Sequence, residues 1–285
     1  MKGALILTIA ALPLAAAGWQ DDHRWKLDEK ETIRRNFDTA GGSGGRKLLV
    51  DNVNGFIHVT GTGGSEVQVT VEKHIYAASN EAMAEAKRDV KMDMSQQGNF
   101  VRLYADGPFR TAGGTHYRGE NYYGYRVVFD CEVQVPYDTE LVLKALNNGI
   151  QVKKTTGDYD IHGLNGAIEM EDVAGSGLVS TLNGKVKVTF SKNPSKDTQF
   201  KTLNGSVDVY FQNGLNADLK FKKLNGGIYS DFEVAALPRT VAGNGSSGKF
   251  VYRSDRTMAG RAGKGGPELT FDTLNGNIRL HSRTI

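Results

Sequence analysis

Cysteine is nearly absent from this chain, because Cys131 is the only one, and an internal disulfide is therefore excluded. Cys131 lies in a strand-like run, so we expect a free thiol packed in a strand rather than a nucleophile. Proline is also scarce, at 6 residues, whereas glycine is frequent, at 35. Without a collagen period, this composition is typical of β-structure with many tight turns. The net charge of +3 is too small to indicate nucleic acid or a membrane surface as the partner.

Long apolar runs are missing apart from one short stretch at the N-terminus. Lys2 precedes an apolar segment from Gly3 to Ala17, which ends in the small residues Ala15, Ala16 and Ala17. This pattern predicts a signal peptide over residues 1–17, and hence an exported protein that is periplasmic, at the cell surface or secreted. The segment is short for a membrane helix, which needs roughly 20 residues, although an uncleaved anchor is the alternative.

Motifs for catalysis and for metal binding are lacking too. The six histidines are scattered, and none lies in a metal-spaced pair; they are His23, His58, His74, His116, His162 and His281. No G-x-S-x-G elbow is present. Acids in the later part of the chain mostly alternate with apolar residues, as solvated strand faces do; they are Asp158, Asp160, Glu169, Glu171 and Asp172. We therefore expect no catalytic residue, no cofactor and no metal. A polysaccharide-active β-helix enzyme of lyase or hydrolase type remains the alternative.

A repeated unit marked by Leu-Asn, mostly followed by Gly, dominates the sequence. The pairs begin at Leu146, Leu164, Leu182, Leu203, Leu224 and Leu274, with spacings of 18, 18, 21, 21 and 50 residues. A degenerate copy has Val53 in the leucine position. Apolar residues recur three positions before the leucine and four and six positions after it. Each unit is therefore predicted to be two short strands joined at Asn-Gly.

Two architectures use such a unit. Asn-Gly between strands favours a tight hairpin, which would give an antiparallel meander. That register pairs the residue before each leucine with a core position, yet this residue is mostly polar, as at Thr181, Thr202 and Thr273. A corner that turns the leucine and both strands inward avoids the conflict. We therefore predict a mainly β fold, a single-stranded right-handed β-helix or solenoid whose units stack at roughly 4.8 Å; handedness does not follow from the residues alone.

The corner asparagines align along such a stack. We expect a ladder of side-chain amides formed by Asn147, Asn165, Asn183, Asn204, Asn225 and Asn275. Glycine follows because the corner is expected to need a positive φ, and Asn148, which precedes Gly149, also tolerates that region. A structural role for these asparagines outweighs ligand binding.

Four parts are predicted along the chain: the signal peptide at 1–17, a flexible leader at 18–46, an α+β cap at 47–136 and the repeats at 137–285. The leader ends in the glycine-rich run from Gly41 to Gly45. In the cap, Ser79-Asn80-Glu81 begins the one strong helix candidate, which continues to about Met94. A loop insertion at 238–267 interrupts the repeats, and Phe250-Val-Tyr252 within it is a candidate degenerate unit.

Two insertions are candidates for recognition. Residues 107–124 carry tyrosines among adaptable polar neighbours, which suits binding of a sugar or a protein surface; the candidate ligand residues are His116, Tyr117, Arg118, Tyr122 and Tyr123. The 238–267 insertion is rich in cations that suit an anionic polymer: Arg239, Lys249, Arg253, Arg256, Arg261 and Lys264, against Asp255. For both insertions, an ordinary glycine-rich loop is the simpler interpretation.

The repeats resemble an exported bacterial β-strand-repeat family called "putative adhesin" (domain of unknown function 4097). The resemblance covers roughly Lys47 to the C-terminus and rests on Asn54-Gly-Phe-Ile-His-Val59, Val133-Gln-Val-Pro136 and the Leu-Asn-Gly copies. It implies a right-handed β-helix-like stack in the cell envelope and supplies no catalytic residues. We expect a non-enzymatic adhesin or scaffold whose partner is an envelope polysaccharide or another surface protein, without an integral membrane span after signal removal.

Overall fold

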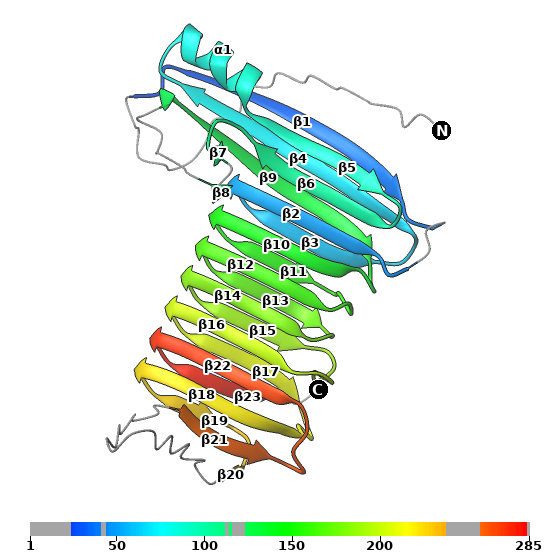
Figure 1. The fold of residues 1–285 in the computed structure, drawn as a ribbon, viewed down its shortest axis with the longest axis vertical. Helices are drawn as coiled ribbons and strands as arrows, with labels where there is room; N and C mark the ends of the chain where they lie inside the picture. Colours follow the sequence, from blue (N-terminus) through cyan, green and yellow to red (C-terminus); the bar gives the residue numbers. More distant parts are fainter. Residues whose placement is uncertain (1–23, 41–43, 112–113, 116–122, 238–256, 284–285) are drawn as a thin grey trace, which may run out of the picture.

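The computed structural model describes residues 24–40, 44–111, 114–115, 123–237 and 257–283. Figure 1 shows two large sheets lying against each other along one elongated stack, with a helix at the N-terminal end. The mainly β class is therefore confirmed. The predicted signal peptide at 1–17 lies outside the described residues.

Each repeat contributes one strand to each sheet, and we call this strand–corner–strand unit a coil. Successive coils pair in parallel and in register, so Ile161 lies beside Leu143 on one side and beside Val179 on the other. Because side chains alternate along a strand, one row from each sheet points inward. These rows form the core, where Phe200, Phe211 and Phe271 are fully buried and pack on one another.

The described residues form two large sheets and one small one. Sheet A consists, in spatial order, of β1 (Leu27–Asp38), β4 (Glu66–Ala77), β9 (Tyr125–Pro136), β3 (Ile57–Thr62), β11 (Ile150–Lys153), β13 (Ile168–Val173), β15 (Val186–Phe190), β17 (Val207–Gln212), β23 (Ile278–Arg283) and β19 (Ile228–Ser230). Sheet B consists of β20 (Val234–Ala236), β21 (Thr257–Ala262), β18 (Ala217–Asn225), β22 (Glu268–Asn275), β16 (Thr198–Asn204), β14 (Gly177–Asn183), β12 (Tyr159–Asn165), β10 (Glu140–Asn147), β2 (Lys47–Asn54), β6 (Phe100–Asp106) and β5 (Lys91–Gln97). The small sheet pairs β7 (Arg110–Thr111) with β8 (Gly114–Thr115).

The coils are not stacked in the order of the sequence. The last coil, β22–β23, lies between β16–β17 and β18–β19, as the red strands in Figure 1 show. The first coil, β2–β3, is likewise internal, because β6 and β9 pair with it on the side opposite to β10 and β11. The chain therefore places β18–β19 one position further along the stack than the final coil. The position next to β16–β17 is filled by β22–β23, which follows the 50-residue spacing before Leu274.

Both sheets are mixed rather than purely parallel. At the N-terminal end, β9, β4 and β1 pair antiparallel, and β5 pairs antiparallel with β6. At the other end, β21 pairs antiparallel with both β18 and β20. The prediction of a loop over 238–267 is therefore wrong at residues 257–262, which form β21.

Two further predictions are corrected at the N-terminal end. Residues 27–38 were predicted to be part of a flexible leader, yet they form β1, with Leu27, Ile33 and Phe37 on its inward face. The predicted helix ends early, because α1 spans Asn80–Asp89 and Met94 lies in β5. The helix start does lie at Ser79, whose hydroxyl oxygen accepts a hydrogen bond from the Ala82 amide.

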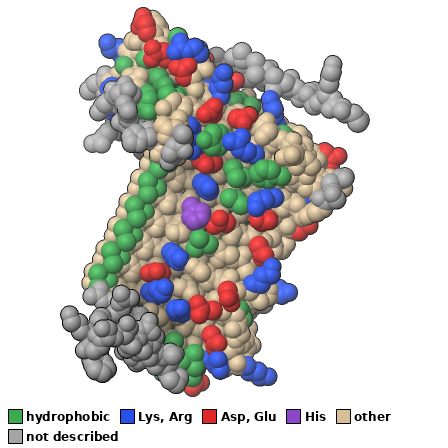
Figure 2. All heavy atoms as spheres, viewed as in Figure 1, with side chains coloured by type: hydrophobic (Ala, Val, Ile, Leu, Met, Phe, Trp, Pro, Cys, Tyr) green, Lys and Arg blue, Asp and Glu red, His purple; other side chains and the backbone are tan. Residues whose placement is uncertain are grey.

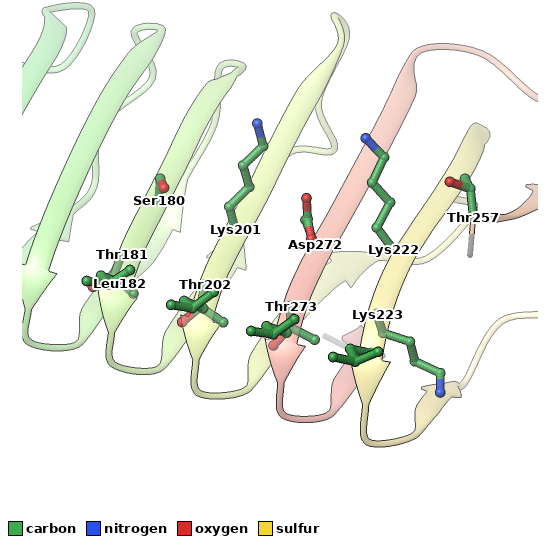
Figure 3. Close-up of a pocket in the computed structure, with 13 residues that line it drawn as sticks. Ser180, Thr181, Leu182, Lys201, Thr202, Lys222, Lys223, Thr257, Asp272 and Thr273 are labelled. Carbon is green, nitrogen blue, oxygen red and sulfur yellow. The ribbon is translucent and has the colours of Figure 1, made fainter. Parts of the chain in front are cut away.

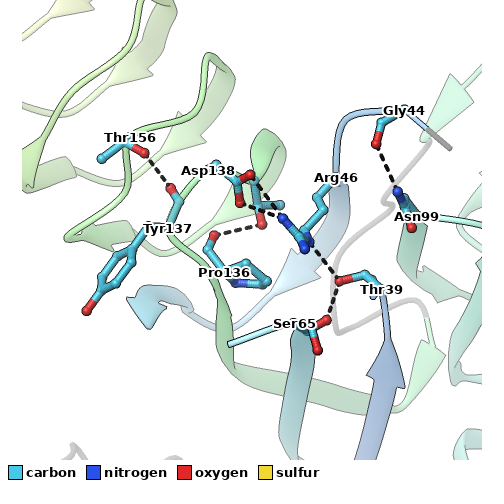
Figure 4. A network of polar contacts seen from close by, with 10 residues as sticks. Thr39, Gly44, Arg46, Ser65, Asn99, Pro136, Tyr137, Asp138 and Thr156 are labelled. Atoms are coloured by element: carbon cyan, nitrogen blue, oxygen red, sulfur yellow. Dashed lines mark hydrogen bonds and ion pairs between the residues drawn. The ribbon is translucent and has the colours of Figure 1, made fainter. Parts of the chain in front are cut away.

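A polar network joins the N-terminal strands to the coils on the edge opposite the Leu-Asn-Gly corners (Figure 4). The Arg46 guanidinium lies at its centre, donating to the Thr39 hydroxyl at 3.2 Å and pairing with Asp138 at 3.0 Å. The Thr39 hydroxyl in turn donates to the carbonyl oxygen of Ser65. The network ties the β1–β2 and β3–β4 connections to the start of β10.

Candidate binding surface

The direction of the side chains at each corner determines which surface the stack displays. In β14, β16 and β22, the residue before the leucine points inward and the leucine points outward. Thr181, Thr202 and Thr273 are 4%, 5% and 1% exposed, although threonine is polar. Each hydroxyl donates to the carbonyl oxygen of a corner glycine in the adjoining coil, at 3.0, 2.8 and 3.1 Å. Burial of a polar residue is therefore compensated by a hydrogen bond.

The prediction that the leucines point inward is wrong. Leu182, Leu203, Leu224 and Leu274 are 37–42% exposed, and Leu146 and Leu164 are half-buried. A polar residue before the leucine does face the core here, as at Thr181, Thr202 and Thr273. The hydroxyl of that residue donates a hydrogen bond to a carbonyl oxygen at the corner of the neighbouring coil. The alternation of inward and outward side chains therefore continues to the end of the strand.

The corner asparagines lie in a single row of hydrogen bonds. Asn147 donates to Asn54, Asn165 to Asn147, Asn183 to Asn165 and Asn204 to Asn183, at 2.8–3.2 Å. Asn275 then donates to Asn204 at 2.9 Å and Asn225 donates to Asn275 at 2.7 Å. The row includes Asn54 and follows the spatial order of the coils, so Asn275 precedes Asn225. Most of these side chains are exposed, hence the row is a surface ladder.

The reason predicted for the corner glycines applies to only some of them. Gly55 and Gly226 have a positive φ, and so does Asn148, but Gly184 and Gly276 do not lie in that region. A Cβ on Gly184 would overlap the carbonyl oxygen of Gly166 in the adjoining coil. Glycine is therefore required chiefly because the corners are stacked too closely for a side chain.

We call the outward leucines at the corners of sheet B the leucine ridge; in spatial order they are Leu146, Leu164, Leu182, Leu203, Leu274 and Leu224. Figure 2 shows hydrophobic side chains in an unbroken line along the long edge where the corners lie. The strands beneath pair in register, so the ridge is straight, with a spacing of roughly 4.8 Å per leucine. A contiguous row of exposed apolar side chains is typical of an interaction site.

A shallow groove of about 610 Å³ runs beside the ridge on the outer face of sheet B. Its apolar side is formed by four ridge leucines, Leu182, Leu203, Leu274 and Leu224, and its polar side includes Lys201, Asp272 and Lys222. Figure 3 shows these three polar side chains projecting from adjacent strands on the same face. Within the described part of the chain, Lys201 and Lys222 have no ion-pair partner, so both ammonium groups are available to a ligand.

The outer face of sheet A differs, because its charges are paired with one another. Lys187 contacts Glu169 at 2.6 Å, and Asp208 receives both Lys185 and Arg279. Burial would raise the pKa of Asp208, but the hydrogen bonds from Lys185 and Arg279 outweigh it and hold that pKa below its usual range. A surface whose charges neutralise each other offers less to a charged partner than the groove on sheet B.

The predicted ligand loop is largely outside the described residues, which omit His116, Tyr117, Arg118 and Tyr122. Tyr123 is described; it is half-buried and its ring lies 5.6 Å from that of Tyr125. Most of the predicted cationic insertion is also outside, including Arg239, Lys249, Arg253, Asp255 and Arg256, as is the candidate unit Phe250-Val-Tyr252. Of its remaining cations, Arg261 pairs with Asp218 at 2.6 Å.

Candidate nucleophiles and metal ligands do not converge in the described residues. Cys131 is buried, and burial raises the pKa of its thiol, so the reactive thiolate is disfavoured. Among the described residues, no group of three His, Cys, Asp or Glu side chains is arranged to hold a metal ion. The strand acids are engaged individually: Asp158 with Lys196, Asp160 with His162 and Glu171 with Lys153.

The ridge and its lysines are the features that sequence reasoning missed. The available signal was the polar residue before each leucine combined with strict alternation, which places the leucine outside.

Within the described residues, no helix has both the length and the apolar character needed to cross a membrane.

No family model matches the chain, and no curated protein matches it. Solved structures that match this one over most of its length include a "putative cell adhesion protein" from Clostridium sporogenes, 12% identical, with a TM-score of 0.44 over 90% of this chain and 100% of that one. A "putative adhesin" from Bacteroides fragilis is 10% identical, with a TM-score of 0.35 over 89% and 97%. A "putative lipid binding protein" from Parabacteroides distasonis is 9% identical, with a TM-score of 0.30 over 87% and 96%. Proteins described as adhesins are thus among its structural neighbours, at an identity and similarity too low to assign a function.

Proposed function

We propose that this chain is an exported, non-enzymatic protein of the cell envelope that acts by binding, as an adhesin or scaffold. Its coils form a right-handed β-solenoid of the strand-repeat adhesin type, and the leucine ridge with the adjoining groove is its binding surface. The observation that carries the proposal is the straight row of exposed leucines beside lysines that have no ion-pair partner among the described residues.

Binding is favoured over glycoside hydrolysis by the composition of the groove. Glycoside hydrolysis typically uses two carboxyl groups on either side of the scissile bond. The groove has Asp272 as the carboxylate in its lining, beside Lys201, Lys222 and Lys223. One carboxylate among several ammonium groups suits retention of an anionic ligand better than acid–base hydrolysis.

The test is binding of purified protein to isolated cell envelope. The variant L203N/L274N keeps side chains of similar size but makes the middle of the ridge polar, and it should bind several-fold more weakly. Y229S is the matched control, because Tyr229 is 58% exposed but lies on sheet A. Equal binding by the wild type and by a folded ridge variant would reject the ridge as the binding surface.

A further inference from the structure

We infer that the surface which meets the leucine ridge is an anionic lipid bilayer; this inference rests on the proposal that the ridge is the binding surface. The net charge of the chain does not indicate such a partner, but the distribution of charge around the ridge does.

The shape suits a soft, flat partner. The leucines lie in one straight row along a long edge of the stack (Figure 2), beside an open groove rather than inside an enclosed pocket. Four of them are 37–42% exposed. The outer part of each of these side chains therefore projects from the surface, and the rest packs against neighbouring residues. The interfacial region of a bilayer accepts a projecting apolar row without needing a complementary shape.

Cations lie beside the apolar row, where lipid phosphates would be. Lys144 and Lys222 are exposed and Lys201 is half-buried, and all three occupy the position two residues before a ridge leucine. Among these side chains Asp272 is the acidic one at the same position, on the strand between Lys201 and Lys222. Anionic lipids attract lysines near the membrane surface, and long lysine stems let the ammonium group reach the headgroup layer.

A second copy of the chain fits the ridge less well. A stable interface buries about 800 Å² on each partner, far more than one row of leucines of which less than half is exposed. An isologous contact would also bring the lysines beside the ridge on the two copies towards each other. A soluble anionic polymer would engage the lysines but leave the leucines in water. A bilayer with anionic lipids uses both.

The experiment is co-sedimentation of the full chain with vesicles of phosphatidylcholine alone, or with phosphatidylglycerol added. Wild-type protein should bind the anionic vesicles at least ten-fold more tightly, and raised salt should weaken this binding. Both L203N/L274N and K201E/K222E should lose at least ten-fold in affinity. K153E on sheet A, where Lys153 pairs with Glu171, should retain wild-type affinity. The apolar segment at residues 3–17 is present in every variant, so its contribution is common to all.

A second measurement locates the contact. In a background that carries W19F and W25F, which removes both native tryptophans, tryptophan placed at the ridge as L203W should shift its emission to shorter wavelength and be quenched by bromine-labelled acyl chains. Y229W on sheet A, in the same background, should show neither change. Failure of wild-type protein to bind anionic vesicles, or an unchanged L203W spectrum on binding, would overturn the inference. Envelope binding that needs the ridge without any vesicle binding would overturn the lipid partner alone and leave the proposed function standing.

Discussion

The hydroxyl of Thr202 donates to the carbonyl oxygen of Gly184 at 2.8 Å, from the core-facing row of one coil to the corner of the adjoining coil. This contact allows a polar residue to face the core, and thereby turns the next residue, Leu203, to the outside. The stability of the coils and the exposure of the ridge therefore depend on the same alternation.

Replacing Thr202 with valine should remove that hydrogen bond while keeping the shape of the side chain. The Gly184 carbonyl then loses its hydroxyl donor in a half-buried site, so the free energy of unfolding should fall by about 1–2 kcal/mol. Urea unfolding measures the change. Thr202→Ser retains the hydroxyl and should cost less than Thr202→Val; an equal loss in both variants would contradict the role of the hydrogen bond.

Replacing Gly184 with alanine should disrupt the stacking of corners. The added Cβ overlaps the carbonyl oxygen of Gly166, and relief requires neighbouring coils to separate, at about 3 kcal/mol. Thermal unfolding should show a clearly lowered midpoint. Gly45→Ala is the matched control, since a Cβ there meets nothing within 4 Å; a similar midpoint for both variants would show that close approach is not the constraint.

Replacing Asn204 with alanine should interrupt the asparagine ladder. Asn204 donates to Asn183 at 2.8 Å and accepts from Asn275 at 2.9 Å. Because the ladder is exposed, water replaces part of each lost bond, and we expect a loss of about 0.5–1.5 kcal/mol. A double-mutant cycle with Asn183→Ala should give a coupling of at least about 0.5 kcal/mol. Additive losses would mean that the two amides do not act together.

Lys73 provides a pH-dependent prediction. Its side chain is 6% exposed and donates to the carbonyl oxygen of Val90 at 2.8 Å, at the end of α1. Burial lowers the pKa of the ammonium group below its ordinary 10.5 and outweighs the opposing attraction of Glu31 and Glu29. The unfolded chain therefore binds the proton more tightly than the folded protein between the lowered pKa and 10.5. In that window the free energy of unfolding should rise with pH.

Urea unfolding from neutral pH to pH 10.5 tests this prediction. Lys73→Met should flatten the rise, because the buried amine is gone. Lys192→Met changes an exposed lysine between β15 and β16, and it should leave the rise in place. A wild-type free energy of unfolding that falls steadily over this range would contradict the assigned direction.

Much of the architecture could be predicted from local patterns. The two strands of each coil follow from alternation, and the Asn-Gly spacing locates the corners, because both depend on residues close in sequence. The end of the helix could not be placed, since Val90 and Met94 are four residues apart, and an even spacing also puts two residues on the same face of a strand. Strand β1 could not be predicted either, because charged residues, which are common on edge strands, separate its inward-facing Leu27, Ile33 and Phe37 and obscure their alternation.

The candidate surface could not be predicted, for a different reason. Whether Thr202 faces the core depends on a carbonyl oxygen in another coil, and single-strand patterning contains no information about that partner. The position of the last coil also depends on residues far apart in the sequence. The 50-residue spacing before Leu274 does not indicate between which strands that coil lies.

That position has a consequence for how the molecule matures. β18–β19 leaves the ribosome before β22–β23, yet the finished protein holds β22–β23 between β18–β19 and its predecessor. The 21-residue step from Leu203 to Leu224 equals the step from Leu182 to Leu203, so a growing chain has the reach to stack β18 directly on β16. If that pairing forms, it must open before the C-terminal coil can enter. A fusion attached after β23 would then impede folding as well as binding.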